Sequence, residues 1–413
     1  MNKKKIINDP LYGFINIPNE LIYDIINHPY FQRLRRIKQL GMTDFVYPGA
    51  LHTRFHHALG SMHLMNESLI NLRHKGIELS EEEFNAALIA ILLHDVGHAP
   101  FSHALENELI PGLDHEQISL IIMHELNRQF GGALELAIQI FNDSYPRKFL
   151  HQLVSSQLDI DRLDYLNRDS YFTGVIEGRI GSERIIKLLN VFNDELVVEE
   201  KGIYSIENFL SARRLMYWQV YIHKTTVGVE KMLIQIIRRV KALNGNADLS
   251  PELDFFINNT ITQQMMEKDK GILQAFCYLD DYDILGAIKR WYHHEDVVLS
   301  QLCRMLLERR LFNVRLSESK PDSRELKALK NHVIESYGIN DNLVKHFVVE
   351  GTKSNSAYIG GGQQINMLTK AGKIVDIANA SDLPNIKAMR KIVKKYYLCW
   401  PKNISLHTEL KHQ

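Results

Sequence analysis

An apolar run that ends in a histidine–aspartate pair marks the centre of this sequence. Residues 84–93 are apolar on nearly every helical face and lead into the segment His94-Asp95-Val96-Gly97-His98. Ser80, with Glu83 three residues later, is typical of a helix N-terminus. We therefore predict a buried helix over residues 81–94. Because adjacent side chains on a helix diverge by about 100°, His94 and Asp95 can share one ion only if the helix ends or distorts there.

Histidines are concentrated around this pair: ten of the 19 lie between His52 and His124. Imidazole is a common ligand of transition metals and a common proton carrier near neutral pH. A lone buried histidine is more often a hydrogen-bonded core residue, and a His-Asp dipeptide also arises by chance. A buried His94-Asp95 pair with neither partner nor metal would nevertheless be costly. We therefore favour a metal-dependent hydrolytic site.

Further ligands must come from other segments. Residues 54–57 supply an imidazole beside a guanidinium, and residues 159–165 supply several carboxylates, of which Asp161 is the leading candidate. Residue types alone leave Asp161 open as a ligand. Two imidazoles and two carboxylates would suit one divalent ion of Mn, Fe, Co, Ni or Zn.

Basic residues near these segments indicate a phosphate substrate, because a guanidinium binds phosphoryl oxygens with two parallel hydrogen bonds. Arg54 and Arg162 adjoin candidate ligands. A later helical segment carries Tyr217, Tyr221 and Lys224 at a spacing that places them on one helix face. Such a face can stack a base and hold phosphates. Without the metal motif, an ordinary amphipathic helix would be the preferred interpretation.

Charge and cysteine content exclude several classes of protein. The chain has 413 residues, with 49 basic and 49 acidic side chains, and its pI is about 7.3. This balance argues against a nucleic-acid partner, although a local basic patch stays open. Three dispersed cysteines argue against a disulfide framework and a cysteine zinc site. We see no signal peptide or membrane span, so we expect a cytoplasmic protein without membrane contact.

The periodicity predicts a mainly α fold with a smaller α+β region at its C-terminal end. Helical patterns dominate residues 19–246, interrupted by a hairpin that we predict at 196–205, and a long helical pattern covers 207–243. After a break near residue 320 we predict strands at 347–350 and 364–377, a flexible loop at Gly360 and a closing helix over 385–397. We therefore expect a core over 1–320 and an oligomerisation or regulatory region over 321–413.

These segments carry a close resemblance to a known family. His57, His94-Asp95 and Asp161 match the H…HD…D signature of the HD-domain phosphohydrolases. Within that superfamily, the chain resembles the deoxynucleoside triphosphate triphosphohydrolases (dNTPases). This group includes an animal enzyme with an added SAM domain and shorter bacterial enzymes without it, and our chain looks like the bacterial type. The resemblance is dense from residue 5 to about 230, and it rests on segments 7–13, 31–41, 47–50, 53–60, 94–103, 115–117, 159–165 and 168–169.

The resemblance implies a set of site residues. The metal ligands would be His57, His94, Asp95 and Asp161. His98, His103 and His115 would line the reacting phosphate as catalytic residues, together with Glu106, where the family more often has aspartate. The implied substrate-binding residues are Gln39, Arg54, Arg162, Tyr165, Asp169, Arg213, Tyr217, Tyr221 and Lys224.

The family is often activated by nucleotides and assembles as oligomers, so we expect a homodimer or homotetramer. The residues that match its activator site are Lys5, Asn8, Asn27, Gln32 and Arg35. Asn27 departs from the pattern, because the animal enzyme has an aspartate there that reads guanine. A neutral amide cannot accept the two N–H donors of guanine in the same way.

The resemblance implies hydrolysis of a dNTP to a deoxynucleoside and inorganic triphosphate, with Mg²⁺ as a further ion on the nucleotide phosphates. Two alternatives remain. One is a different HD-domain phosphohydrolase, such as a 5′-nucleotidase or phosphodiesterase. The other is a nucleotide sensor or nucleic-acid-binding protein without catalysis, which the basic, tyrosine-bearing segment 387–402 supports slightly. A pure sensor would not need all four metal ligands.

Overall fold

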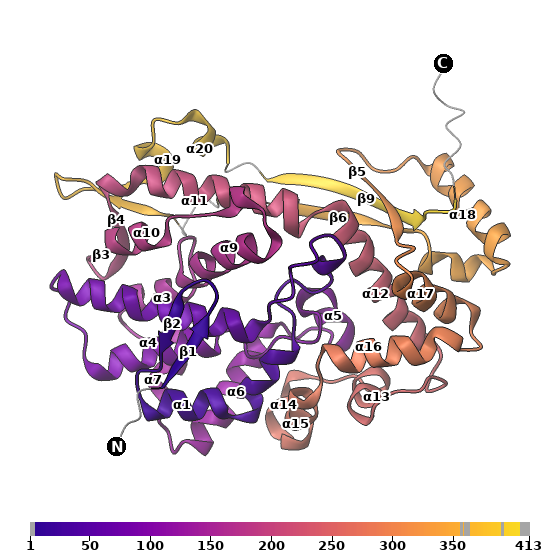
Figure 1. Cartoon of the computed structure of the whole chain (residues 1–413), viewed down its shortest axis with the longest axis horizontal. Coiled ribbons are helices and arrows are strands. Elements are labelled where there is room, and N and C mark those ends of the chain that lie inside the picture. The colour runs from indigo at the N-terminus through magenta and orange to yellow at the C-terminus, as the bar shows by residue number, and fades with distance from the viewer. Residues whose placement is uncertain (1–4, 356–357, 359–363, 390–391, 405–413) are drawn as a thin grey trace.

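A computed structural model describes residues 5–355, 358, 364–389 and 392–404. The fold is mainly helical, as predicted, with the long strands β6 (Val349–Asn355) and β9 (Val393–Pro401) running along one side (Figure 1). One continuous cluster of buried apolar side chains extends from Ile15 to Ile404. The last third of the described chain therefore packs onto the helical core.

Three helices form the centre of this core. Helix α3 (Arg54–His74) packs against both α4 (Glu81–Leu93) and α9 (Ile160–Thr173). In α4, Ser80 and Glu83 form the predicted capping box, and every residue from Ala86 to Leu93 is buried. The helix ends at Leu93, so His94 and Asp95 leave it together. The structure thus confirms both the buried helix and its end at the pair.

Further helices surround these three. Those before residue 203 are α1 (Glu20–Asn27), α2 (Pro29–Gln32), α5 (Glu106–Leu109), α6 (His115–Gln129), α7 (Glu135–Phe141), α8 (Lys148–Val154) and α10 (Ser182–Leu188). Short 3₁₀ segments lie at η1 (Arg33–Arg36), η2 (Thr43–Phe45), η3 (Ser102–Ala104), η4 (Ile176–Gly178), η5 (Glu200–Gly202), η7 (Trp291–His293) and η8 (Asp341–His346).

The predicted helical pattern over 207–243 is confirmed, with one irregularity. Helix α11 (Ile203–Met216) continues into the π-helical segment η6 (Tyr217–Tyr221), and α12 (Lys224–Ala242) follows. π-Helical turns are often found at functional sites. Figure 1 shows α11 mostly to the left of the long strands and α12 below them.

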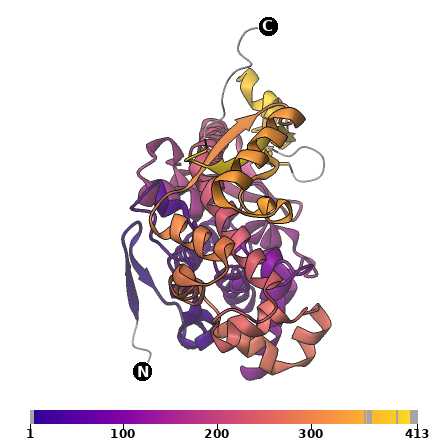
Figure 2. The ribbon, with the colours of Figure 1, turned by 90° about the vertical axis from the view of Figure 1, so that its right-hand side faces the viewer.

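The helices between residues 251 and 337 gather on the side of the molecule that faces the viewer in Figure 2. They are α13 (Pro251–Asn258), α14 (Gln263–Lys268), α15 (Lys270–Tyr278), α16 (Asp281–Arg290), α17 (Val297–Leu307) and α18 (Ser323–Tyr337). The short helices α19 (Ile377–Ala380) and α20 (Pro384–Ala388) lie elsewhere, above α11 in Figure 1. No helix of the described chain is both long and apolar enough to cross a bilayer.

The predicted hairpin at 196–205 is wrong in its turn. Strand β3 (Leu189–Phe192) pairs with β4 (Glu195–Glu199), and the turn is Asn193-Asp194. Both turn residues have positive φ, 50° and 62°, which Asn and Asp tolerate better than most side chains. Gly202 instead lies at the start of α11, where an added Cβ would meet Val198 at 2.7 Å.

In the described part of the chain, the strands form three small sheets. The hairpin β1 (Ile6–Asp9) and β2 (Gly13–Asn16) stands alone. A second sheet has the order β3-β4-β7-β8, with β7 (Asn366–Leu368) and β8 (Ile374–Asp376), and a third has β5-β9-β6, with β5 (Phe312–Ser317). Strands in 349–355 and 366–376 confirm the predicted C-terminal strands, whereas the Gly360 loop lies outside the described residues.

The predicted closing helix over 385–397 is wrong. Helix α20 is short, and β9 is the central strand of its sheet, paired antiparallel with both β5 and β6. Valine, tyrosine and tryptophan side chains in β9 favour a strand when both edges find partners. Because β5 precedes residue 320 and β9 follows it, the two parts of the chain share this sheet. The boundary near 320 stays a prediction.

Candidate metal centre and nucleotide pocket

Four predicted ligands converge at the end of α4. His57 Nε2 lies 3.0 Å from Asp161 Oδ1 and 3.3 Å from His94 Nε2, and His94 Nε2 lies 3.4 Å from Asp161 Oδ1. Asp95 Oδ2 lies 3.6 Å from His57 Nε2, and Asp95 Oδ1 lies 3.5 Å from His94 Nε2. Donors about 2.1 Å from one ion stand roughly 3.0–3.4 Å apart. The spacing of His57, His94 and Asp161 fits a single divalent ion, and Asp95 lies slightly farther out, with a different oxygen toward each imidazole.

The rear nitrogens of both imidazoles are held by hydrogen bonds. His57 Nδ1 donates to Asp164 Oδ2 at 2.7 Å, and His94 Nδ1 donates to the carbonyl of Ile91 at 2.6 Å. These bonds turn each Nε2 toward the other candidate ligands, the usual arrangement around protein metals.

A buried ion-pair chain fixes Asp164 in turn. Arg168 Nε donates to Asp164 at 2.9 Å, and its Nη1 donates to Asp9 at 2.8 Å. Helix α3 crosses α9 here at Gly60, where a Cβ would lie 2.1 Å from side-chain atoms of Asp164 and Arg168. Glycine at this position therefore allows the two helices to approach closely enough for the contact.

The electrostatics of the cluster also favour a cation. Burial lowers the pKa of His57, but hydrogen bonds with Asp161 and Asp164 outweigh it and raise the value to about 10. Burial likewise opposes ionisation of Asp161, yet His57 and His94 hold its pKa well below the ordinary range. A buried imidazole with a raised pKa lies in a strongly negative field. The donor set and this field fit a divalent transition metal.

A second histidine cluster lies beside the first. The rings of His98 and His115 stack with centroids 3.9 Å apart, and His103 meets His115 edge-on at 5.1 Å. Glu106 bridges His115 and His103: it accepts from His115 Nδ1 at 2.8 Å and from His103 Nδ1 at 3.2 Å. The predicted catalytic set is therefore brought together, and glutamate in place of aspartate still reaches both imidazoles.

Glu106 and His115 stabilise one another's charged forms. Burial raises the pKa of Glu106, but the hydrogen bonds from His103 and His115 dominate and hold it well below its ordinary value. Burial lowers the pKa of His115, and the bond to Glu106 reverses this and raises it. His98 Nε2 lies 3.2 Å from Asp95 Oδ1, so the two clusters touch.

Close packing positions His115 at the start of α6. Gly97, in the turn after His94-Asp95, lies against the first turn of α6, and a Cβ there would be 2.4 Å from the His115 carbonyl oxygen. The backbone N–H of Gly97 donates to Ser119 Oγ, which in turn donates to the His94 carbonyl. The turn that carries His94 and Asp95 and the helix that carries His115 are thus directly joined.

A pocket of about 390 Å³ adjoins both clusters. Arg54 is common to pocket and metal centre: its Nη1 donates to Asp95, its Nε donates to Ser102 Oγ at 2.8 Å, and it lines the pocket wall. The predicted residues that line this pocket are Gln39, Arg54, His103, Tyr165, Asp169, Tyr217 and Tyr221.

Tyrosines and one carboxylate shape the middle of this pocket. Tyr221 donates its hydroxyl to Asp169 Oδ2 at 2.8 Å and meets Tyr165 edge-on with centroids 6.1 Å apart. His52, for which the sequence predicted no role, holds the other oxygen of Asp169 at 2.7 Å. The buried Gln39 Oε1 has no hydrogen-bond partner among the described residues, so it offers an unused acceptor at the pocket wall.

Three predicted substrate cations stand outside this wall, as far as the described residues show. Arg162 pairs with Asp159, and Arg213 Nη1 donates to Gln157 Oε1 at 3.0 Å. The buried Nε atoms of both arginines have no partner in the described chain. Lys224 occupies the first turn of α12. Their substrate roles remain predictions.

The predicted activator residues gather near α1. Lys5 Nζ lies 3.3 Å from the centroid of the Tyr23 ring, and Asn27 donates to the Tyr23 carbonyl at 2.8 Å. Arg35 Nε donates to Gln32 Oε1 at 2.8 Å, and Asn8 lies in β1. Activator binding here stays a prediction.

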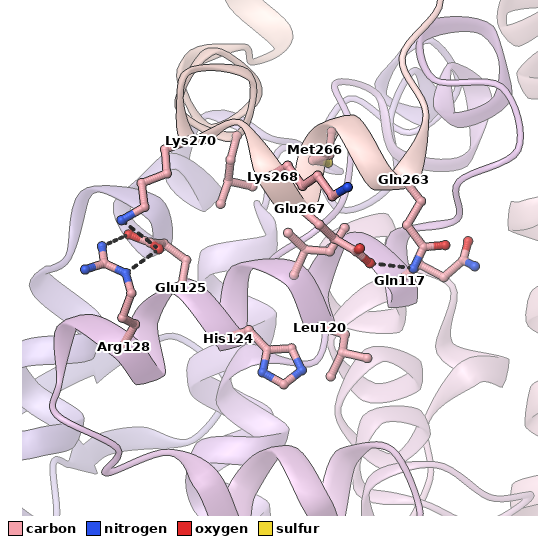
Figure 3. Close-up of a pocket in the computed structure, with 12 residues that line it drawn as sticks. Gln117, Leu120, His124, Glu125, Arg128, Gln263, Met266, Glu267, Lys268 and Lys270 are labelled. Atoms are coloured by element: carbon pink, nitrogen blue, oxygen red, sulfur yellow. Dashed lines mark hydrogen bonds and ion pairs between the residues drawn. The ribbon is translucent and has the colours of Figure 1, made fainter.

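A second pocket, of about 540 Å³, lies away from the metal centre between α6, α14 and α15 (Figure 3). Figure 3 shows Arg128 and Lys270 turned toward Glu125, and Gln263 bonded to Glu267. The carboxylates that line this pocket thus already pair with neighbouring side chains. Because it includes none of the candidate metal ligands, its greater volume does not make it the candidate reaction site.

Comparison with protein families gives two matches. The HD domain model matches residues 54–169, which include all four converging ligands, and the HD associated region model matches residues 180–251. The uncharacterized protein YwfO of Bacillus subtilis is 31% identical over 98% of this chain and 94% of its own length.

Named enzymes and solved structures are similar as well. The human deoxynucleoside triphosphate triphosphohydrolase SAMHD1 is 31% identical over 55% of this chain and 43% of its own length. A crystal structure of a phosphohydrolase from Bacteroides thetaiotaomicron is 50% identical, with a TM-score of 0.93, covering 97% of this chain and all of that one. A hypothetical protein from Aquifex aeolicus has 26% identity and a TM-score of 0.72, with 97% of each chain covered.

Proposed function

Because this chain belongs to the HD-domain family with an HD-associated region, we propose that it hydrolyses deoxynucleoside triphosphates to a deoxynucleoside and inorganic triphosphate. Membership of this family makes a metal-dependent phosphohydrolase the general expectation. The human relative is named a deoxynucleoside triphosphate triphosphohydrolase, and the Dictyostelium discoideum relative is named as its homolog. The chain spans 58% of the Dictyostelium protein and 43% of the human one, so their activity is here a proposal.

One observation carries the proposal: Arg54 belongs at once to the metal cluster and to the tyrosine-lined pocket. A guanidinium there can hold an α-phosphoryl oxygen while the attached sugar enters the pocket. The His98, His103 and His115 cluster then lies on the same side as the phosphate. A substrate that joins a phosphate to a sugar matches this continuity.

A bound divalent ion would polarise the phosphoryl group and lower the pKa of a coordinated water. Cleavage breaks the bond between the α-phosphorus and the 5′-oxygen, and that oxygen must receive a proton. His115, kept protonated by Glu106, is our proposed donor, with His103 on the same carboxylate. Arg54 offsets the charge that gathers on the phosphoryl oxygens.

The pocket also favours a deoxyribose. We propose that Gln39 and Asp169, which both line the pocket, accept a hydrogen bond from the sugar 3′-hydroxyl. We propose that Tyr221, fixed by its bond to Asp169, packs on the 2′-carbon, where a hydroxyl would clash. Tyr165 covers a further part of the sugar. Ribonucleotides should therefore be poor substrates.

The test is a screen of the four dNTPs and four NTPs, singly and in pairs, with Mn²⁺, Fe²⁺, Co²⁺, Ni²⁺ or Zn²⁺ and with Mg²⁺ added for the nucleotide phosphates. Release of inorganic triphosphate from dNTPs supports the proposal. Release of orthophosphate or a nucleoside monophosphate would indicate a 5′-nucleotidase or phosphodiesterase instead. No turnover with any metal would indicate a nucleotide sensor.

A further inference from the structure

The nucleotide pocket has a second wall that takes no part in the proposed chemistry. This wall comes from three distant segments: the stretch before α3, the start of α12 and strand β6. Its members are Met42, Thr43, Ile222, Glu230, Lys353 and Ser354. No polar contact of these residues reaches a metal ligand within the described chain. With the phosphate on Arg54 and the sugar on Tyr221, a nucleobase would extend toward them.

Two opposite charges face each other in this wall. Lys353 Nζ, on β6, lies 3.5 Å from Glu230 Oε2, on α12, and their side chains are 33% and 22% exposed. Neither head group makes a hydrogen bond to another described residue. The ammonium therefore retains its donors, and the carboxylate retains both acceptor oxygens, at the edge of a partly sheltered pocket.

We propose that Glu230 and Lys353 read the base and select guanine, an inference that rests on the proposed function. Guanine presents a carbonyl, O6, beside two neighbouring donors, N1–H and N2–H. A carboxylate accepts both donors at once through parallel charge-assisted bonds, and an ammonium donates to O6. Ile222 and Met42 supply apolar surface for the faces of the base. The preferred substrate is then deoxyguanosine triphosphate, dGTP.

The other bases satisfy this pair less completely. Adenine has one donor group, N6, beside an acceptor, N1, so the second carboxylate oxygen finds no partner. Thymine has one donor, N3–H, flanked by two carbonyls, and one of these would oppose the carboxylate. Unpaired buried polar groups are the strongest source of discrimination between similar ligands.

Lys353 also explains what the C-terminal sheet contributes to the core. Strand β6 pairs with β9 through Lys353 and Lys395, and this pairing brings Lys353 to the pocket from a segment more than a hundred residues beyond α12. The region after residue 320 thus supplies part of the specificity wall.

The test compares kcat/KM for dGTP and dATP in wild-type protein and in Glu230→Gln, with metal supplied. We expect wild type to prefer dGTP by about tenfold or more, since one bidentate pair provides discrimination of that order. Glu230→Gln should reduce the ratio by about tenfold. Glu350→Gln, an exposed site on β6 outside the pocket, is the matched control and should keep the wild-type ratio.

Lys353→Met separates base reading from phosphate binding. Base reading predicts a loss confined mainly to dGTP, whereas an equal loss on all four dNTPs would assign Lys353 to the phosphates and overturn the proposal. Lys394→Met on β9 is its control. A wild-type ratio near one, or one unchanged by Glu230→Gln in a folded protein, would also overturn it.

A binding measurement distinguishes this inference from the proposed function. Calorimetric titration with dGTP and dATP needs no turnover, so it reads base preference even if no nucleotide is hydrolysed. If wild type binds dGTP more tightly than dATP and Glu230→Gln removes this difference, base reading is supported. If no triphosphate is released in the same protein, only the proposed reaction is refuted. Equal binding of the two nucleotides to wild type would refute base reading even if triphosphate is released.

Discussion

His57 donates its Nδ1–H to Asp164 at 2.7 Å, and this contact turns the opposite nitrogen of the ring toward Asp161, 3.0 Å away. Asp161 and Asp164 lie three residues apart on α9, so they share one face of that helix. One carboxylate therefore lies on the metal side of the imidazole and the other lies behind the ring. The proposed metal centre therefore depends on both carboxylates.

Replacing the rear carboxylate should weaken the metal centre without removing a ligand. In Asp164→Asn, the neutral amide holds the His57 ring less firmly, and we expect metal affinity to fall about 10- to 100-fold. Isothermal titration with Mn²⁺ measures this. Asp254→Asn, an exposed change on α13, serves as the control. Wild-type affinity in Asp164→Asn would show that Asp164 does not position the ligand.

Gly97→Ala should separate the two clusters. The added methyl would lie within 2.4 Å of the His115 carbonyl and the Ser119 nitrogen, so α6 must shift and carry His115 with it. We expect kcat for triphosphate release to fall at least about tenfold, because small misplacements of catalytic groups cost large factors. Gly286→Ala on α16, where the nearest atom is 3.5 Å away, should keep its activity. Equal activities would contradict the packing argument.

Glu106→Gln should impair the proton transfer to the leaving group. The amide cannot stabilise a charged His115, so we expect kcat to fall about a hundredfold with KM little changed. Steady-state kinetics on a dNTP give both constants. Glu108→Gln, on the same helix but paired with Arg238 on the surface, is the control. A large rise in KM with kcat intact would instead make Glu106 a substrate-binding group.

A buried histidine outside the site predicts how stability changes with pH. His346 is 3% exposed, and burial, aided by Arg239, lowers its pKa to about 4. The unfolded chain gains this proton near pH 6.5 and the folded chain only near pH 4. The contribution is therefore fully present above about pH 6.5 and is lost as pH falls toward 4.

Urea unfolding at pH 7.5 and pH 5 tests this sign. From His346 we expect a loss of about 2 kcal/mol in the free energy of unfolding on acidification. His346→Gln removes the titrating group, so the variant should lose less unfolding free energy on acidification than the wild type does. The difference should equal the contribution of His346. An equal loss of unfolding free energy in both proteins would mean that the pKa of His346 is not lowered in the folded state.

The convergence of the candidate ligands could be predicted because a local pattern carries part of the set. The apolar run of α4, its capping box and its abrupt end at His94 are encoded between Ser80 and His94, and His57 and Asp161 follow from the family resemblance. The spacing of 159–165 did not reveal that Asp164 lies behind His57. That role depends on the crossing of α9 and α3 at Gly60.

Long-range pairing explains the features that local sequence pattern did not predict. Residues 393–401 form a strand because β5 and β6 offer partners on both edges, and local pattern cannot show those partners. The Glu230–Lys353 contact likewise joins α12 to β6, so no motif in either segment indicates it. His52 is one of many histidines in the sequence, and only its bond to Asp169 in the folded chain distinguishes it.

The most direct test of the metal centre is elemental analysis of purified protein, comparing wild type with Asp161→Ala. Asp161 supplies an oxygen next to both imidazoles, so we predict about one equivalent of a divalent transition metal per wild-type chain and almost none in the variant. Circular dichroism should show that the variant stays folded, and triphosphate release should cease. Equal metal content in the two folded proteins would contradict the convergence of His57, His94, Asp95 and Asp161 on one ion.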